Sequence, residues 1–167
     1  MTQGAMRADI ALRAATSADV AALWKLVSDN AAGTPYEELP AYFLRLALTA
    51  PSEESRAIVV MQGGAVVGCA VYGVVAGTIG TGRIHFVTVA AGSRRLGIAS
   101  RLCGVAVDAL SAQAVRNVIV ELPDDRVVGA GRALLERCAF TEVARIPDYY
   151  RDGVALVVLQ RTVFPAE

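Results

Sequence analysis

The stretch that decides the fold is IHFVTVAAGSRRLGIA, residues 84–99. Its first part, IHFVTV, is rich in β-branched and aromatic residues and predicts a strand over residues 84–90. The small residues AAGS then predict a turn, and a helix is expected to begin at Gly97. A strand that leads through such a turn into a helix brings unpaired backbone N–H groups and the positive end of the helix dipole together. This segment therefore predicts an anion-binding site.

Three residues favour a phosphate group as the anion. Arg94 and Arg95 stand at the start of the predicted helix and add positive charge there. Gly97 has no side chain, so a phosphate group can approach the backbone closely. The alternative is an ordinary strand-to-helix turn with a solvated basic patch. The sequence contains neither a GxxxxGK[ST] phosphate loop nor a complete GxGxxG dinucleotide fingerprint.

Outward from this stretch, hydrophobic periodicity predicts alternating strands and helices. The predicted strands cover residues 9–13, 57–62, 65–75, 84–90, 117–122 and 154–161, and the predicted helices cover residues 20–29, 34–48, 97–112 and 128–138. Thr16 and Asp19 have the spacing of a capping box before the first helix. Pro35 is expected at the first position of the second helix, which Pro40 offsets or restarts. Gly63-Gly64 predicts a tight hairpin between two strands.

Composition indicates one folded domain over residues 1–167, with residues 1–8 as a flexible tail. The hydrophobic fraction of 54% favours a packed core, and a formal net charge of zero favours neither nucleic acid nor a membrane surface as a partner. The longest apolar run, residues 65–77, is too short to span a bilayer, and the N-terminus lacks a secretory pattern. We therefore expect a cytoplasmic protein. Lys25 is the single lysine, and this arginine bias is typical of a bacterial genome rich in G and C.

The cysteines do not suggest a disulfide framework or a metal site. Cys69, Cys103 and Cys138 are odd in number and far apart, and no CxxC pair occurs. Each lies in an apolar stretch. We therefore expect buried, reduced thiols and no bound metal.

Residues 94–99, RRLGIA, resemble the acyl-CoA-binding motif of the GNAT superfamily of N-acyltransferases, (Gln/Arg)-x-x-Gly-x-(Gly/Ala). Arg94, Gly97 and Ala99 occupy its three fixed positions, and the predicted order of elements matches the family over essentially the whole chain. The resemblance implies an α/β fold with a mixed, mostly antiparallel central sheet. This sheet is expected to have about six or seven strands, flanked by about four helices on both faces.

The resemblance also implies how acetyl-CoA would bind as the co-substrate. In the family, the fourth strand and the next buried strand splay apart, and backbone groups of the fourth strand pair with pantetheine. Besides Phe86, the predicted residues for that role are Val87, Thr88 and Val89. The diphosphate is expected on backbone N–H groups, with help from the arginine side chains, at Arg94, Arg95, Leu96, Gly97, Ile98, Ala99 and Ser100.

Glu121 is the leading candidate for the catalytic base. Amine acetylation requires removal of a proton from the amine, and Glu121 ends the predicted strand at residues 117–122. In family members that resemble the ribosomal-protein alanine acetyltransferases, a glutamate at this strand end has that role. The alternative is a charge that reaches solvent or pairs with an arginine. His85, the single histidine, is a second candidate, with a packing residue as its alternative.

The chain departs from the family pattern before Phe140. Aligned on Phe140, the family's Asn-x-x-Ala-x-x-x-Tyr-x-x-x-Gly-Phe places Val128 at the asparagine, Leu135 at the tyrosine and Ala139 at the glycine. The usual tyrosine that protonates the thiolate is therefore absent. Residues 124–126 also lengthen the loop before this helix.

The aromatic segment at residues 147–153 offers a replacement for that tyrosine. Tyr149 or Tyr150 could supply the acid or pack against the acceptor. The alternative is aromatic cover over the core, followed by a turn at Asp152-Gly153.

Residues around the first two helices border the acceptor site in the family. Acidic groups there could attract a cationic amine, although capping charges in solvent are the simpler interpretation. The residues concerned are Asp29, Glu37 and Glu38. Trp24, Tyr42 and Phe43 are expected in the core.

The sequence thus favours an acetyl-CoA-dependent N-acetyltransferase. Its acceptor would be a primary amine of a small molecule or a peptide N-terminus, attacked directly in a ternary complex. A homodimer is compatible with the resemblance. The alternatives are an acyl-CoA-binding sensor or partner domain without strong catalysis, and a structural α/β domain without a ligand.

Overall fold

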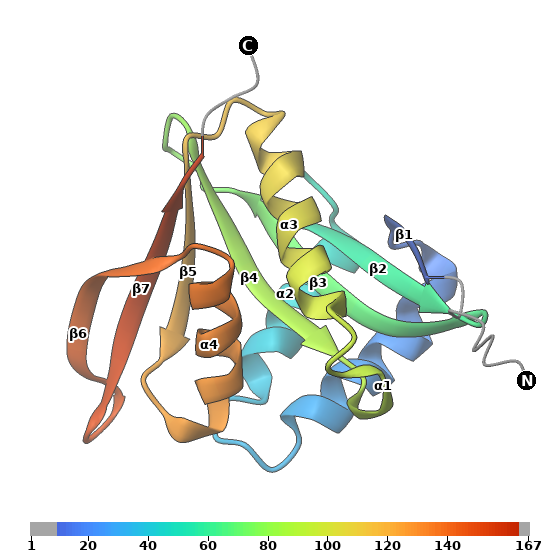
Figure 1. Ribbon diagram of the computed structural model, residues 1–167, viewed down its shortest axis with the longest axis horizontal. Coiled ribbons are helices and arrows are strands. Elements are labelled where there is room, and N and C mark those ends of the chain that lie inside the picture. Colours follow the sequence, from blue (N-terminus) through green and yellow to red (C-terminus); the bar gives the residue numbers. More distant parts are fainter. Residues whose placement is uncertain (1–9, 164–167) are drawn as a thin grey trace, which may run out of the picture.

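The computed structural model describes residues 10–163 as one twisted sheet with helices on both faces (Figure 1). The strands are β1 (Ile10–Ala14), β2 (Arg56–Gln62), β3 (Ala65–Val74), β4 (Thr81–Val89), β5 (Asn117–Pro123), β6 (Thr141–Arg151) and β7 (Val154–Thr162). The α-helices are α1 (Val20–Ala31), α2 (Glu38–Thr49), α3 (Ile98–Ser111) and α4 (Gly129–Arg137). The tail expected over residues 1–8 lies outside the described residues. The predicted mixed α/β fold is confirmed.

The sheet is antiparallel except at one neighbouring pair. Its strand order is β1-β2-β3-β4-β5-β7-β6, and β4 and β5 run parallel. Their paired positions extend only from Thr81 with Asn117 to Arg83 with Ile119. Beyond these positions the two strands diverge, as Figure 1 shows. We call this divergence the splay.

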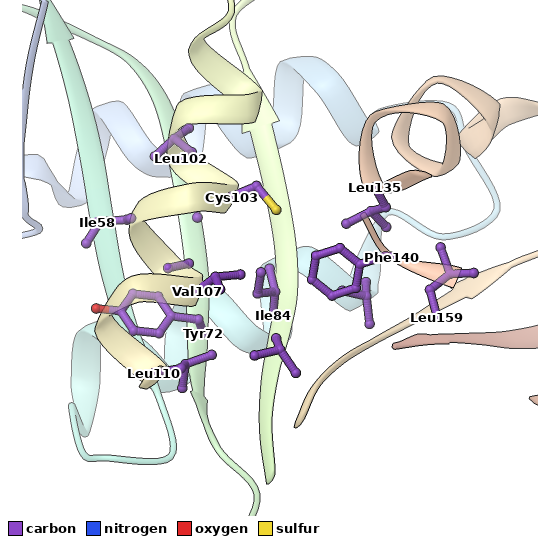
Figure 2. Close-up of a cluster of buried hydrophobic side chains, with 14 of the residues drawn as sticks. Ile58, Tyr72, Ile84, Leu102, Cys103, Val107, Leu110, Leu135, Phe140 and Leu159 are labelled. Carbon is purple, nitrogen blue, oxygen red and sulfur yellow. The ribbon is translucent and has the colours of Figure 1, made fainter. Parts of the chain in front are cut away.

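Alternating side chains of the central strands build two cores, one on each face of the sheet. Ile58, Val60 and Tyr72 lie in the core beneath α3 and α4, whereas Val59 and Val71 lie in the core beneath α1 and α2. Figure 2 shows Leu102, Val107 and Leu110 of α3 beside Ile58 and Tyr72, with Leu135 and Phe140 packed further along the same face. Because the central strands are buried on both faces, their sequences are almost continuously apolar.

Two local predictions about turns and caps are confirmed. Gly63 and Gly64 connect β2 to β3 with φ values of 57° and 82°, so both residues have the left-handed backbone that a two-residue hairpin turn favours. Before α1, the backbone N–H of Thr16 donates to Asp19 Oδ2 at 2.8 Å. Arg13 also contacts that carboxylate, at 2.6 Å, and holds the pKa of Asp19 well below its usual range.

Two element boundaries differ from the predictions. Residues 34–37 form turns, and α2 begins at Glu38, so the predicted helix start at Pro35 is wrong. Pro40 therefore lies in the first turn of α2, where its missing N–H removes no intrahelical hydrogen bond. In addition, β6 covers residues 141–151, where no strand was predicted. This strand is at the edge of the sheet, where Pro147 is tolerated and side chains are exposed, so no alternation of buried residues marks it.

Several predictions about burial are also tested by the fold. Cys69 and Cys103 are buried and Cys138 is half-buried, and all three are free thiols. Burial raises the pKa of Cys69 to about 12. Trp24 and Tyr42 are 37% and 49% exposed, so their expected place in the core is wrong.

Candidate active site

The connection from β4 to α3 has the backbone geometry of an anion-binding loop. A short 3₁₀ turn, Ala91–Ser93, leads into residues 94–97, which we call the entry loop. Arg95 and Gly97 have φ values of 65° and 75°, and this left-handed backbone turns successive N–H groups outward. Within residues 10–163, no acceptor is found for the backbone N–H groups of residues 95–100. A Cβ atom at Gly97 would meet no atom within 4 Å, so the space beside the loop is open.

The two arginines of the entry loop differ in their surroundings. Arg94 folds back onto the protein: its Nε donates to the Val89 carbonyl at 3.3 Å, and its Nη2 donates to Asn30 Oδ1 at 2.5 Å. Asn30 in turn donates to Thr88 Oγ1 at 2.7 Å. Arg94 thus ties the entry loop to α1 and to the end of β4, whereas Arg95, which is also exposed, has no side-chain hydrogen bond or ion pair within residues 10–163.

His85 forms a β-bulge in β4 close to the splay. Val71 pairs with Phe86 and Tyr72 pairs with Ile84, so His85 has no paired position in β3. A bulge redirects side chains and increases local twist. It comes two residues after Arg83, the last position of β4 that pairs with β5.

A cavity of about 460 Å³ lies along the splay, between the strands and the α1–α2 region. It brings together all four residues predicted to be catalytic, namely His85, Glu121, Tyr149 and Tyr150. Of the residues predicted to bind pantetheine, Val87 and Thr88 line this cavity, as does Phe86, whereas Val89 does not. Residues 94–100 lie outside it, at the start of α3.

Glu121 forms an ion pair across the splay. Its Oε1 atom accepts a hydrogen bond from Arg83 Nη2 at 2.8 Å, and the two side chains are 35% and 28% exposed. The arginine pairing considered as an alternative for Glu121 is therefore present. The carboxylate still lines the cavity and has a second oxygen for other contacts.

His85 lies between Phe43 and the chain before β2. Its ring stacks on Phe43 with centroids 4.1 Å apart, and its Nε2 lies 3.4 Å from the Glu54 carbonyl. Burial lowers the pKa of His85 to about 4, so the imidazole is neutral at pH 7. Its Nδ1 is buried without a hydrogen-bond partner. These features describe a hydrogen-bonding and packing residue rather than a strong base.

The two tyrosines of β6 have different exposure. Tyr150 is half-buried, and its ring meets those of Tyr149 and Tyr36 edge to face, with centroids 5.1 Å and 5.5 Å apart. Burial, and then the negative charge of Glu121, raise the pKa of Tyr150 above its ordinary value of 10. The phenol therefore keeps its proton at pH 7. Tyr149 is 58% exposed at the cavity mouth.

A cluster that the sequence analysis missed joins three segments beside the cavity. Asp125 Oδ2 accepts from the Tyr36 hydroxyl at 2.8 Å and from Arg151 at 2.7 Å, and Asp125 Oδ1 accepts from the Val127 N–H at 3.1 Å. These hydrogen bonds lower the pKa of Asp125. We call Tyr36, Asp125 and Arg151 the clamp. Tyr36 and Asp125 are 89 residues apart, and no local pattern marks such a pair.

The acidic residues predicted beside the acceptor site lie outside the cavity lining. Asp29 pairs with Lys25 at 2.6 Å, Glu37 accepts from the Gly33 N–H, and neither these two residues nor Glu38 lines the cavity. Leu135 is buried in the core.

In the described part of the chain, no three His, Cys, Asp or Glu side chains gather in a way that could hold a metal ion. Within residues 10–163, no helix has the length and hydropathy needed to cross a membrane.

Comparison with known proteins agrees with this geometry. Residues 21–140 match a family model described as "Acetyltransferase (GNAT) family". The chain belongs to this family. No curated protein matches the sequence significantly.

Solved structures show the same fold at low sequence identity. A GNAT-family protein from Desulfovibrio desulfuricans is 18% identical, with 92% of this chain and 99% of that chain covered and a TM-score of 0.82. The ribosomal-protein-alanine N-acetyltransferase from Brucella melitensis is 21% identical, with 92% and 99% covered and a TM-score of 0.73. The ribosomal-protein-S18-alanine N-acetyltransferase from Escherichia coli is 18% identical, with 95% and 97% covered and a TM-score of 0.74.

Proposed function

We propose that this protein transfers an acetyl group from acetyl-CoA to a primary amine, by direct attack in a ternary complex. The observation that supports this most is the continuity of the site. Unpaired N–H groups at residues 95–100 follow β4 after the short connection at residues 90–94, and β4 lines the cavity that contains Glu121 and Tyr150. A single extended co-substrate could thus contact both places.

The residues present fit acetyl-CoA. The entry loop offers outward N–H groups, open space beside Gly97 and the exposed charge of Arg95, which suit a diphosphate. Val87 and Thr88 line the cavity from β4, and β4 beyond Arg83 has no strand partner on the β5 side among the described residues. These backbone groups suit the amides of pantetheine. Acetyl-CoA supplies the thioester whose acyl group is transferred.

Glu121 is proposed to remove the proton from the acceptor amine, directly or through water. An amine with a pKa of about 10.4 is deprotonated in only about one molecule in a few thousand at pH 7, so a base accelerates attack. The Arg83 contact fixes the direction of one carboxylate oxygen. The other oxygen is then held ready for the amine.

Tyr150 is proposed to donate a proton to the leaving sulfur. Its raised pKa keeps the phenol protonated, and it lies in the same cavity as Glu121. This role would replace the family tyrosine, whose position is occupied by the buried Leu135. His85 is proposed to support the bulge and the cavity wall as a neutral residue.

One observation favours a second candidate function. Because Leu135 cannot donate a proton, the chain could bind acyl-CoA without turning it over, as a sensor or partner domain. This function predicts binding of acetyl-CoA without release of a thiol.

The experiment is a thiol-release assay on the purified chain with acetyl-CoA and a panel of primary amines. We expect amine-dependent thiol release, and Glu121→Gln should lower kcat by about 100-fold or more while the affinity for CoA is unchanged. Glu53→Gln, on an exposed glutamate outside the cavity, is the matched control and should behave as the parent. Thermal stabilisation by CoA without release for any amine would support the sensor function instead.

A further inference from the structure

The walls of the cavity are mostly apolar and aromatic, apart from the Arg83–Glu121 ion pair and the polar side chains of Asn30, Thr34 and Thr88. Phe43 stacks on the neutral His85, and Tyr150 meets the rings of Tyr36 and Tyr149 edge to face. The Tyr36 hydroxyl is already hydrogen-bonded to Asp125. Such walls favour a ligand body that needs no hydrogen bonds.

The mouth of the cavity is also apolar. Leu39, Val127 and Tyr149 come from three separate segments and are 41%, 55% and 58% exposed, yet all three line this cavity. We call these residues the rim. Large apolar side chains that are exposed together around a cavity indicate contact with an apolar ligand.

The charged groups of the cavity are already matched to each other. Glu121 is the only carboxylate, and Arg83 the only guanidinium, among the described residues that line it. They form an ion pair at 2.8 Å, so their formal charges cancel. Glu121 can receive one amine, and no second carboxylate from residues 10–163 lines the cavity.

The carboxylates near the cavity do not change the cancelled formal charge of its lining. Asp125 already accepts hydrogen bonds from Tyr36, Arg151 and Val127. The acidic residues on and beside α1 and α2, Asp29, Glu37 and Glu38, do not line the cavity. A second ammonium group on the acceptor would lose its hydration without gaining a hydrogen bond or an ion pair, and burial of such an unpaired charge costs free energy. An acceptor carboxylate would compete with Glu121 for Arg83.

We infer that the acceptor is a primary monoamine with an apolar body: its amine lies at Glu121, and its body packs against the aromatic walls and the rim. This inference deepens the proposed function and rests on it. It excludes polyamines and short amino acids as the preferred acceptors.

The test compares three acceptors of equal chain length: pentylamine, 1,5-diaminopentane and 5-aminopentanoate. They share an amine on a chain of four methylene groups and differ only beyond it, in a methyl, an ammoniomethyl or a carboxylate group. With saturating acetyl-CoA, we expect kcat/KM for pentylamine to exceed that of each of the others by about tenfold or more, after correction for the two amines of the diamine.

A matched pair of variants places the selectivity at the rim. Val127→Asp should raise kcat/KM for 1,5-diaminopentane relative to pentylamine by about threefold, the effect of a partly exposed ion pair. Val143→Asp is the control, because Val143 is 54% exposed on β6 and does not line the cavity. It should leave the ratio unchanged.

The outcomes separate this inference from the proposed function. If no amine releases a thiol, both fail. If amines are acetylated but the diamine or the amino acid is used as well as pentylamine, only the inference is overturned. An equal shift of the ratio in both aspartate variants would also overturn it, because the rim would then have no special role.

Discussion

At the splay, a charged side chain and a neutral one lie close together in the sequence of β4. Arg83 and His85 are two residues apart on β4, yet one pairs with Glu121 and the other stacks on Phe43. The ion pair directs the carboxylate, and the stacked histidine keeps that part of the wall uncharged. Glu121, the proposed base, therefore shares the cavity with a neutral histidine rather than a charged one.

His85 should make the stability of the protein pH-dependent. Its pKa is about 4 in the folded protein, against an ordinary value of 6.5, so the neutral form is favoured by folding. The stabilisation is complete above pH 6.5 and is lost as the pH falls toward 4. We expect the free energy of unfolding to fall by about 1 kcal/mol between pH 6.5 and 5.5, before most carboxylates titrate.

Denaturant unfolding at several pH values measures this effect. Because His85 is the single histidine, His85→Gln should flatten the profile over that interval. An unchanged slope in the variant would mean that the folded protein does not favour the neutral imidazole.

Elements far apart in sequence meet at the clamp. Tyr36 lies in the α1–α2 connection, Asp125 lies between β5 and α4, and Arg151 ends β6. The clamp holds Tyr36 against the ring of Tyr150. The negative charge of Glu121 acts on Tyr150 and raises its pKa. The clamp thus positions the proposed acid without contacting the reacting atoms.

Asp125→Ala should loosen this connection. We expect a lower free energy of unfolding and a higher KM for the amine, with the KM for acetyl-CoA changed less. Asp124→Ala is the control, since Asp124 pairs with Arg145 and Arg132 in an exposed network. Equal effects of the two substitutions on the amine KM would contradict a positioning role for the clamp.

The entry loop allows a sharper comparison at a single position. Gly97→Ala and Gly97→Glu both place a side chain on left-handed backbone, at a similar cost of about 1–2 kcal/mol in stability. Only the glutamate adds negative charge to the open space beside the N–H groups. Calorimetric titration with CoA should therefore show at least about 100-fold weaker binding for Gly97→Glu than for Gly97→Ala. Equal affinities of the two variants for CoA would show that this loop does not bind the diphosphate.

These elements also show what the sequence could reveal. The strand, turn and glycine of residues 84–99 are local signals, so the entry loop and the start of α3 were predictable within one residue. The clamp depends on contacts between residues 89 and 26 positions apart, and no periodicity encodes them. Strand β6 was missed because an edge strand needs neither alternation nor the N–H that Pro147 lacks.

In the molecule as a whole, two hydrophobic cores hold the sheet between the helix layers, and at the splay β4 and β5 separate. Apolar side chains on both faces hold β2, β3 and β4 between the helix layers, and β5 diverges from β4 after three paired positions. The nearly continuous apolar runs of the central strands are typical of strands buried on both faces. The divergence itself was expected only from the family resemblance, because strand separation leaves no mark in local sequence.

The central claim is that the N–H groups at the start of α3 hold the diphosphate of acetyl-CoA while the thioester lies beside Glu121. A crystal structure of the protein grown with CoA tests it most directly. We predict diphosphate oxygens within about 2.7–3.2 Å of at least two backbone nitrogens of residues 96–100, with the thiol in the cavity. A diphosphate bound elsewhere, or a thiol outside the cavity, would contradict the account.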